Sequence, residues 1–263
     1  CKDDYREMNF DAQKYNTVSF RSLINDLIRV SIEGEIEYPG IYTLQSDSTL
    51  SELYELVGKF KEEAFMKGII FTRESVRERQ LRSIAKSKQD LNEALLISAQ
   101  KGDNFDINIV RALSENIEPE YLGRVAGNFS PESENIKETV LFDGDTIIIP
   151  KNPNTVNVLG EVLNPIAFQF KPRISVRESI EIAGGFKDYA NKRSVYVIKA
   201  NGLIEKSSRN IFSGNVNLEP GDTIIVPRKI IINNPGLESL LPITQILSDL
   251  AFASAAVESL SNN

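Results

Sequence analysis

The 263-residue sequence contains no histidine and only one cysteine, Cys1. Without histidine, the chain lacks the imidazole that acid–base catalysis, serine–histidine triads and most zinc sites use. A single cysteine excludes an internal disulfide framework and a cysteine-rich metal site. We therefore predict that the chain is not an enzyme, and that it has no catalytic, cofactor-binding or metal-ligating residues.

Basic residues are too few for a typical nucleic-acid-binding protein. The 30 Lys and Arg residues are outnumbered by 37 Asp and Glu, which gives a formal charge of −7 and a pI near 5.0. Binding to phosphates requires a basic surface, so nucleic acid is not an expected partner. No uncharged apolar run reaches about 18 residues, so no conventional single membrane span is predicted. The length suggests about two domains.

Cys1 has two interpretations. An acylated cysteine is the first residue of a mature lipoprotein, whereas a fragment boundary can place any residue there. The chain begins without the basic and apolar segments of a signal peptide, and nothing else near its start is typical of a lipid anchor. A fragment boundary is the preferred interpretation, with residues 1–27 as a segment from a preceding domain.

The sequence contains an internal repeat. Val30–Pro39 (VSIEGEIEYP) reappears as Val156–Pro165 (VNVLGEVLNP), at an offset of 126 residues (156 − 30). Each copy closes with a near-identical segment, Gly144–Pro150 (GDTIIIP) and Gly221–Pro227 (GDTIIVP), at an offset of 77 (221 − 144). The first copy therefore holds 49 additional residues (126 − 77) between the shared ends. Chance does not produce this pattern.

Both copies predict the same short series of elements. A strand, a turn and a second strand precede a helix that opens with a capping box, Thr49 with Glu52 and Ser175 with Glu178. Further strands follow and complete a small α+β unit, in which one helix packs across a mixed sheet. In the first copy, strands are expected at 30–34, 41–44, 68–73 and 145–148, and a helix is expected from an N-cap at Ser48 or Thr49 to its end at Gly58.

The additional residues of the first copy lie between Arg73 and Gly144. Residues 74–100 are rich in charged side chains and predict one long exposed helix with a narrow apolar seam. The seam consists of Leu81, Ile84, Leu91 and Leu95. It fits packing on its own domain and packing on a neighbouring subunit equally well. The following segment, 101–137, is polar and irregular.

These segments resemble a known repeat. The strings GEIEYPGIYTL and TLSELYELVG in the first copy, GEVLNPIAFQF and SVRESIEIAGGF in the second, and both GDTII endings are similar to the soluble-ligand-binding β-grasp (SLBB) repeat. The whole arrangement resembles the C-terminal part of a long-chain member of the Wza-like outer-membrane polysaccharide export (OPX) family. The charged segment 71–87 and the ending 244–260 resemble the same branch. The family's N-terminal export domain has no counterpart among these residues.

The resemblance implies an α+β fold with two tandem β-grasp (SLBB) domains. The first domain is expected at 28–151 with a helical insertion at 74–137, and the second at 154–229. An amphipathic helix is expected at 236–260.

The implied function is that of a non-enzymatic component of a capsule or exopolysaccharide export complex. The component would form an oligomeric conduit across the periplasm and outer membrane of a Gram-negative bacterium. The implied partners are further copies of the chain in a ring, the polysaccharide, and an inner-membrane export or co-polymerase protein. The alternative is a periplasmic module that binds a glycan or small ligand and forms no channel. Fold alone does not decide between them.

Four aromatic residues are candidates for glycan contact, namely Tyr38, Tyr42, Phe168 and Phe170. Strand aromatics stack on sugar rings in some proteins, but they more often pack in a core. The Gly-Glu pairs at 34–35 and 160–161 have two interpretations as well. Their carboxylates could serve a sugar site; the preferred interpretation is that the glycine allows a close backbone approach and the glutamate accepts from turn amides.

The C-terminal segment 242–260 predicts a helix of about 30 Å, comparable to the thickness of a bilayer core. Its apolar face consists of Ile243, Ile246, Leu247, Leu250, Val257 and Leu260. A ring of such helices could contact the outer membrane, although Asp249 would be costly in lipid. Docking of the helix on the second copy or on a partner fits the same face equally well.

Overall fold

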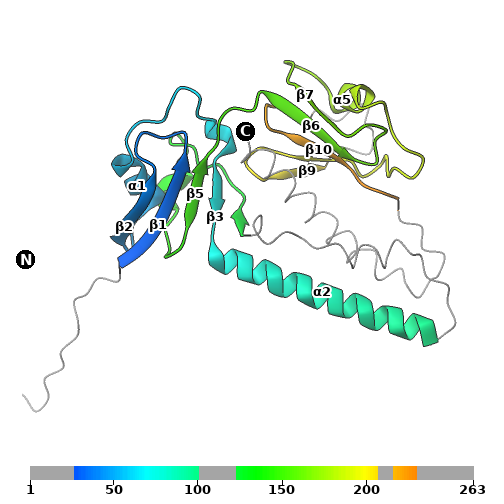
Figure 1. Cartoon of the computed structure of the whole chain (residues 1–263), viewed down its shortest axis with the longest axis horizontal. Coiled ribbons are helices and arrows are strands. Elements are labelled where there is room, and N and C mark those ends of the chain that lie inside the picture. The colour runs from blue at the N-terminus through cyan, green and yellow to red at the C-terminus, as the bar shows by residue number, and fades with distance from the viewer. Residues whose placement is uncertain (1–26, 101–122, 207–215, 230–263) are drawn as a thin grey trace, which may run out of the picture.

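The computed structural model describes residues 27–100, 123–206 and 216–229. They form two five-stranded sheets that lie beside each other (Figure 1). The first contains β1 (Leu27–Gly34), β2 (Gly40–Gln45), β3 (Ile70–Thr72), β4 (Arg124–Val125) and β5 (Thr146–Ile149), in the order β2-β1-β5-β3-β4. The second contains β6 (Thr155–Gly160), β7 (Ile166–Gln169), β8 (Tyr196–Ile198), β9 (Ile204–Lys206) and β10 (Thr223–Val226), in the order β7-β6-β10-β8-β9.

Helices connect these strands. Those that the described ranges contain are α1 (Leu50–Leu56), the 3-10 turn η1 (Met66–Gly68), α2 (Glu74–Gln100), α4 (Asn135–Glu138) and α5 (Val176–Ile182). The long helix α2 begins beside the end of β3 and extends away from the first sheet, so that it runs below the second sheet in Figure 1.

The two sheets have the same topology. In each, the first and last strands pair in parallel, and all other neighbours are antiparallel. α1 and α5 begin at Leu50 and Val176, at the 126-residue offset, and β5 and β10 begin at Thr146 and Thr223, at the 77-residue offset. The predicted α+β fold with two repeated units is confirmed. The exact limits of the two domains, 28–151 and 154–229, stay a prediction.

Both predicted capping boxes are present. The Thr49 hydroxyl accepts from the Glu52 amide, and the Glu52 carboxylate accepts from the Thr49 amide at 3.1 Å. Ser175 and Glu178 repeat this arrangement at the start of α5. A cap of this kind satisfies amides that have no partner within the helix and fixes where the helix begins.

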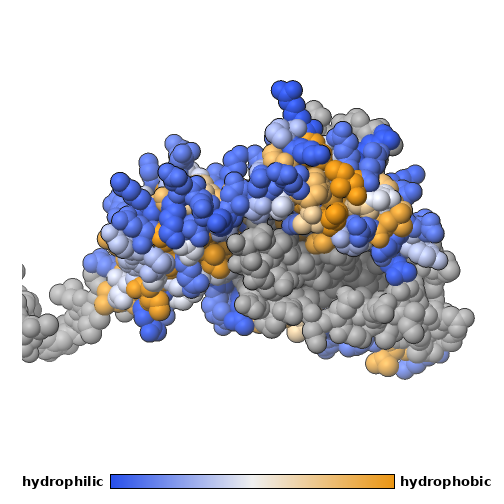
Figure 2. Space-filling view, turned by 45° about the horizontal axis from the view of Figure 1, so that its top comes forward, coloured by the Kyte–Doolittle hydropathy of each residue, from blue (hydrophilic) through white to orange (hydrophobic). Residues whose placement is uncertain are grey.

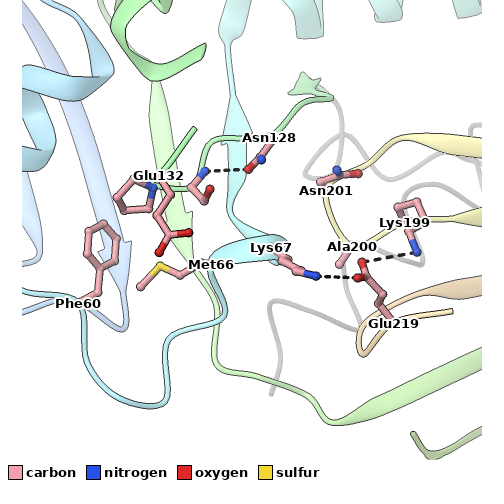
Figure 3. A pocket seen from close by; sticks show the side chains of 11 residues that line it. Phe60, Met66, Lys67, Asn128, Glu132, Lys199, Ala200, Asn201 and Glu219 are labelled. Atoms are coloured by element: carbon pink, nitrogen blue, oxygen red, sulfur yellow. Dashed lines mark hydrogen bonds and ion pairs between the residues drawn. The ribbon is translucent and has the colours of Figure 1, made fainter. Parts of the chain in front are cut away.

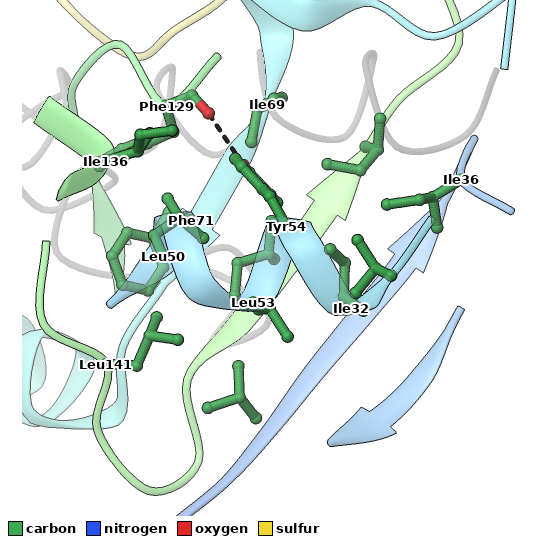
Figure 4. Close-up of a cluster of buried hydrophobic side chains, with 14 of the residues drawn as sticks. Ile32, Ile36, Leu50, Leu53, Tyr54, Ile69, Phe71, Phe129, Ile136 and Leu141 are labelled. Carbon is green, nitrogen blue, oxygen red and sulfur yellow. Dashed lines mark hydrogen bonds between the residues drawn. The ribbon is translucent and has the colours of Figure 1, made fainter. Parts of the chain in front are cut away.

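The first core lies between α1 and its sheet (Figure 4). Leu50 and Leu53 are fully buried there, as the spacing of apolar residues predicts. Tyr54 lies in the same core, where its hydroxyl donates to the Phe129 carbonyl at 2.8 Å. Burial raises the pKa of Tyr54 well above its ordinary value, so the phenol stays neutral.

The segment after the long helix is not wholly irregular, contrary to the expectation for 101–137. Its last part returns to the first sheet, where β4 pairs with β3, and α4 follows. Phe129 and Ile136 are buried in the first core, and the Phe129 ring packs edge-on against Phe71 at 5.1 Å between centroids. Elements of two and four residues are too short to show hydrophobic periodicity, which explains the difference.

Gly34 and Gly160 occupy equivalent positions where the backbone must turn closely around a neighbouring strand. Gly34 has φ +93°, and a Cβ there would lie 2.0 Å from the Ile149 carbonyl oxygen; for Gly160 and Val226 the values are +91° and 2.2 Å. The glycine part of the preferred interpretation is therefore correct. The glutamate part is wrong for Glu35, whose carboxylate pairs with Lys61 at 3.2 Å instead of accepting from turn amides.

Gly34→Ala should lower the free energy of unfolding by more than about 2 kcal/mol, because strain at positive φ adds to a clash with backbone atoms. Urea unfolding followed by circular dichroism measures the change. Gly144→Ala is the matched control, since Gly144 has φ +82° but no atom within 4 Å of the added Cβ. Equal losses in the two variants would show that the close approach at Gly34 contributes nothing.

Candidate functional site

The shared GDTII segments each place a buried aspartate against a cation. Asp145 accepts from Arg73 through two bonds, Nε to Oδ1 at 2.9 Å and Nη2 to Oδ2 at 2.8 Å, and also from the Phe142 amide. In the second domain, Asp222 accepts from Lys199 at 2.5 Å and from the Glu219 amide at 2.8 Å. In both domains, the equivalent aspartate therefore connects the residue after the third strand with the turn before the last strand.

The residue that precedes this aspartate by three positions differs between the domains. In the first domain it is Phe142, and the Arg73 guanidinium lies 4.3 Å from the centroid of its ring. In the second domain it is Glu219, whose carboxylate accepts from Lys67 of the first domain at 2.6 Å and lies 3.7 Å from Lys199. The exchange of an aromatic ring for a carboxylate thus creates a contact between the domains.

Glu219 at this contact and Asp222 behind it, both near Lys199, have opposite pKa shifts. The hydrogen bond from Lys67, helped by the charge of Lys199, lowers the pKa of Glu219. Burial raises the pKa of Asp222, because the loss of water outweighs the hydrogen bond from Lys199. Glu219 is therefore the group whose charged form the domain contact favours.

Arg124 of β4 makes a second contact between the domains. It donates from Nη2 to the Ala200 carbonyl, and its guanidinium lies against Gly202, where a Cβ would lie 2.9 Å from Nε. Burial lowers the pKa of Arg124 to about 10, so the side chain still carries its charge at neutral pH. Nearby, the amide of Gly127 donates to the Asn201 carbonyl at 3.3 Å. Phe65, Ile70 and Ala200 add an apolar contact.

A cavity of about 600 Å³ lies between these contacts. Figure 3 shows that residues of both domains line it and that the Lys67–Glu219 and Lys199–Glu219 pairs lie on one side. The lining consists of Phe60, Met66, Lys67, Asn128, Ser130, Pro131, Glu132, Lys199, Ala200, Asn201 and Glu219. A cavity of this volume accommodates a small ligand, and its amide, hydroxyl and charged groups suit a polar one. Within the ranges 27–100, 123–206 and 216–229, no cluster of His, Cys, Asp or Glu could hold a metal ion.

The four aromatic residues predicted for glycan contact do not line this cavity. Tyr42 packs half-buried on the first core, and Phe168 and Phe170 pack on the second. Tyr38 is 57% exposed in the turn between β1 and β2, where its carbonyl accepts from the Tyr42 hydroxyl at 2.7 Å. The structure thus does not bring the four into one site, and glycan contact by them stays a prediction.

Several predicted residues lie outside the described ranges. They include Cys1, the segment 1–26, and the whole predicted C-terminal helix with Ile243, Ile246, Leu247, Leu250, Val257 and Leu260. Of the α2 seam, Ile84 is buried and Leu81 is 38% exposed. Among the helices of the described ranges, none has the length and apolar character that a membrane crossing needs.

The residues at the domain contact were not among the candidates from the sequence. Lys67 and Glu219 are 152 positions apart, and neither belongs to a motif. A position-by-position comparison of the two copies does contain the signal. Within closely matched segments, Phe142 is replaced by Glu219 and Arg73 by Lys199.

The Lys67–Glu219 ion pair should contribute a coupling energy of about 0.2–1 kcal/mol, because Lys67 is 67% exposed and water screens the pair. A double-mutant cycle of Lys67→Ala and Glu219→Ala, measured by urea unfolding, gives this value. Since the pKa of Glu219 is lowered from 4.5 in the folded state, the contribution is complete above that pH and is lost as pH falls through the folded value. Coupling that does not decline at all as the pH is lowered below 4.5 in the folded state would contradict the assignment.

Comparison with known proteins gives two findings. The SLBB domain family model matches residues 29–78 and 155–207. Over 239 residues, the chain is 29% identical to two curated Escherichia coli proteins, each named polysialic acid transport protein KpsD. Each alignment covers 89% of this chain and 41% of the relative, so the chain spans about two fifths of the length of those relatives.

Proposed function

We propose that this chain, an SLBB-domain protein of the outer-membrane polysaccharide export type, is a non-enzymatic component of a polysaccharide export complex. The observation that carries the proposal is the 29% identity along 89% of the chain to proteins named for polysialic acid transport. The two SLBB matches begin in the first strand of each repeated sheet and cover its first strands and helix, so the repeated fold agrees with the family match.

The proposed mode of action is self-assembly into a conduit across the periplasm and outer membrane, with an inner-membrane export or co-polymerase protein as partner. The 27-residue helix α2, about 40 Å long, supports this mode, because it projects from the first sheet and exposes Leu96 and Ile97. Figure 2 shows hydrophobic side chains gathered on the visible face of the second domain, whereas that of the first is mainly hydrophilic. Exposed apolar surface of this kind favours protein contacts.

Deletion of the gene from its host bacterium tests the export role. We expect polysaccharide to disappear from the cell surface and to accumulate inside the cell, with restoration by a plasmid-borne copy. The chain length and composition of the retained polymer should be unchanged, because a non-enzymatic component does not alter the polymer. Surface polysaccharide at the level of the parent strain would contradict the proposal.

A second candidate function is a periplasmic ligand-binding module, which the cavity at the domain junction favours. A module of this kind would bind one small polar ligand per chain and would stay monomeric. Calorimetry with candidate sugars, together with the mass of the full-length protein in detergent, separates the two functions. One bound ligand per monomer favours the module, and a closed oligomer favours the conduit.

A further inference from the structure

One end of the second domain carries a cluster of basic residues, in the loop after α5 and directly after β10. Backbone contacts hold these two segments side by side. Ala190 and Arg228 form an antiparallel bridge, and the Lys229 amide donates to the Tyr189 carbonyl at 2.6 Å. The basic end surface, as we define it, consists of Lys187, Tyr189, Lys192, Arg193, Arg228 and Lys229. Tyr189, Lys192, Arg193, Arg228 and Lys229 are exposed, and Lys187 is half-buried.

Three basic residues at the equivalent end of the first domain form ion pairs. At the offsets of 126 and 77, Lys187, Arg193 and Arg228 correspond to Lys61, Lys67 and Lys151. Each of these three lysines has an acidic partner: Lys61 with Glu35 at 3.2 Å, Lys67 with Glu219 at 2.6 Å, and Lys151 with Glu63 at 2.7 Å. In the second domain, none of the five basic side chains forms an ion pair with any residue of the described ranges.

One acidic partner position of the first domain changes in the second, whereas the Glu35 position keeps a glutamate, Glu161, which forms no ion pair within the described ranges. Glu63, which pairs with Lys151, is replaced by Tyr189, and the Arg228 guanidinium lies 5.2 Å from the centroid of that ring. Met66 is replaced by Lys192, whose Nζ lies 5.4 Å from the centroid of the Phe186 ring. Acidic and apolar positions of the first domain have thus become aromatic and basic in the second.

The resulting surface is basic in an acidic protein. Its five cations outnumber the nearby acidic residues, which are Asp188 in the same loop and Glu161 in the turn after β6, while the whole chain has a charge of −7. Unpaired Lys and Arg side chains bind carboxylates through charge-assisted hydrogen bonds, and an exposed tyrosine packs on the apolar face of a sugar ring. A polymer that alternates carboxylates and ring faces matches both features.

We propose that the basic end surface binds an anionic glycan through the carboxylate groups of the glycan. The proposal rests on the proposed function, since it names the chemical class of the polysaccharide. The glycan contact would lie where β10 ends, on the side of the second domain that is remote from the first domain and from the cavity at the domain junction (Figure 1). Arg228 and Tyr189 would form the centre of this contact.

Binding of the full chain to alginate, a carboxylated polysaccharide, tests this inference against dextran, a neutral one of the same length. Tyr189→Glu combined with Arg228→Lys introduces the equivalent of the Glu63–Lys151 ion pair of the first domain. Because the first domain folds with this pair, the variant should fold as well. We expect about tenfold weaker alginate binding in this variant and in Lys192→Met, no dextran binding, and weaker binding as salt rises. The control Lys151→Ala, at the equivalent position of the first domain, should change the affinity by less than about twofold.

Two results overturn the inference. The first is alginate affinity that neither variant changes, or dextran binding equal to alginate binding. The second is a variant that loses self-association while it keeps its alginate affinity, which assigns the surface to a contact between copies. Either result leaves the proposed function intact if polysaccharide still accumulates inside cells that lack the gene. Unchanged surface polysaccharide after deletion contradicts the proposed function, whatever the binding experiment gives.

Discussion

Asp145→Ala should lower the free energy of unfolding of the first domain by about 3–5 kcal/mol. Asp145 is fully buried, and its carboxylate accepts two bonds from Arg73, which is only 20% exposed. Its removal leaves a cation without its partner in a largely buried place, and it also frees the Phe142 amide. Urea unfolding of the full chain, followed by circular dichroism and by tyrosine fluorescence, measures the loss.

Asp143→Ala is the matched control for this variant. Asp143 lies two residues away on the surface, where it accepts from the Arg29 amide at 2.8 Å, so its loss should cost less than about 1 kcal/mol. Replacing both partners, with Arg73→Met and Asp145→Leu, should recover part of the stability, because no charge is then left alone. Equal costs for Asp143→Ala and Asp145→Ala would contradict the role of the buried pair.

Replacement of residues 74–122 by Ala-Asn-Gly should remove self-association while the first sheet stays folded. This replacement copies residues 200–202 of the second domain (Ala-Asn-Gly), which close the hairpin between β8 and β9. There the Lys199 amide donates to the Leu203 carbonyl at 2.8 Å. In the first domain, the Arg73 amide donates to the Gly123 carbonyl at 2.9 Å. The two residues that flank the insertion are therefore about as close to each other as Lys199 and Leu203, and a three-residue loop can join them. Mass photometry of the full-length protein in detergent measures the oligomer.

A milder variant serves as the control for this deletion. Leu96→Gln with Ile97→Gln keeps α2 but removes two exposed apolar side chains. It should weaken the oligomer in the same direction and leave the helix content unchanged. An oligomer that survives both changes would exclude α2 as the interface, although it would leave the export role standing.

The sequence predicts the repeated fold well because the signals are local and occur twice. The capping boxes at Thr49 and Ser175 join residues only three positions apart. The same segments 126 residues apart then form the same elements, since equal local signals favour equal local structure. The α+β class and the burial of one face of α1 follow from this.

The sequence does not predict the site at the domain junction, because that site depends on contacts between distant positions. Arg124 reaches Ala200 across 76 positions, and no periodicity connects them. β4 has two residues, and α4 has four, so neither shows a pattern. Tyr42 and Phe168 were candidates for glycan contact, yet both pack on their own cores, since a strand aromatic has the same sequence signal in either role.

Photo-cross-linking in cells that are exporting pulse-labelled polysaccharide tests the central claim most directly. A photoreactive amino acid at the exposed positions Tyr38 and Tyr189 would capture the polymer while it passes the protein. The export account predicts labelled polysaccharide on the protein during the pulse, and loss of that signal during the chase as the polymer reaches the surface. Absence of cross-linked polysaccharide at both positions, or a signal that the chase does not remove, would contradict passage of the polymer along this protein.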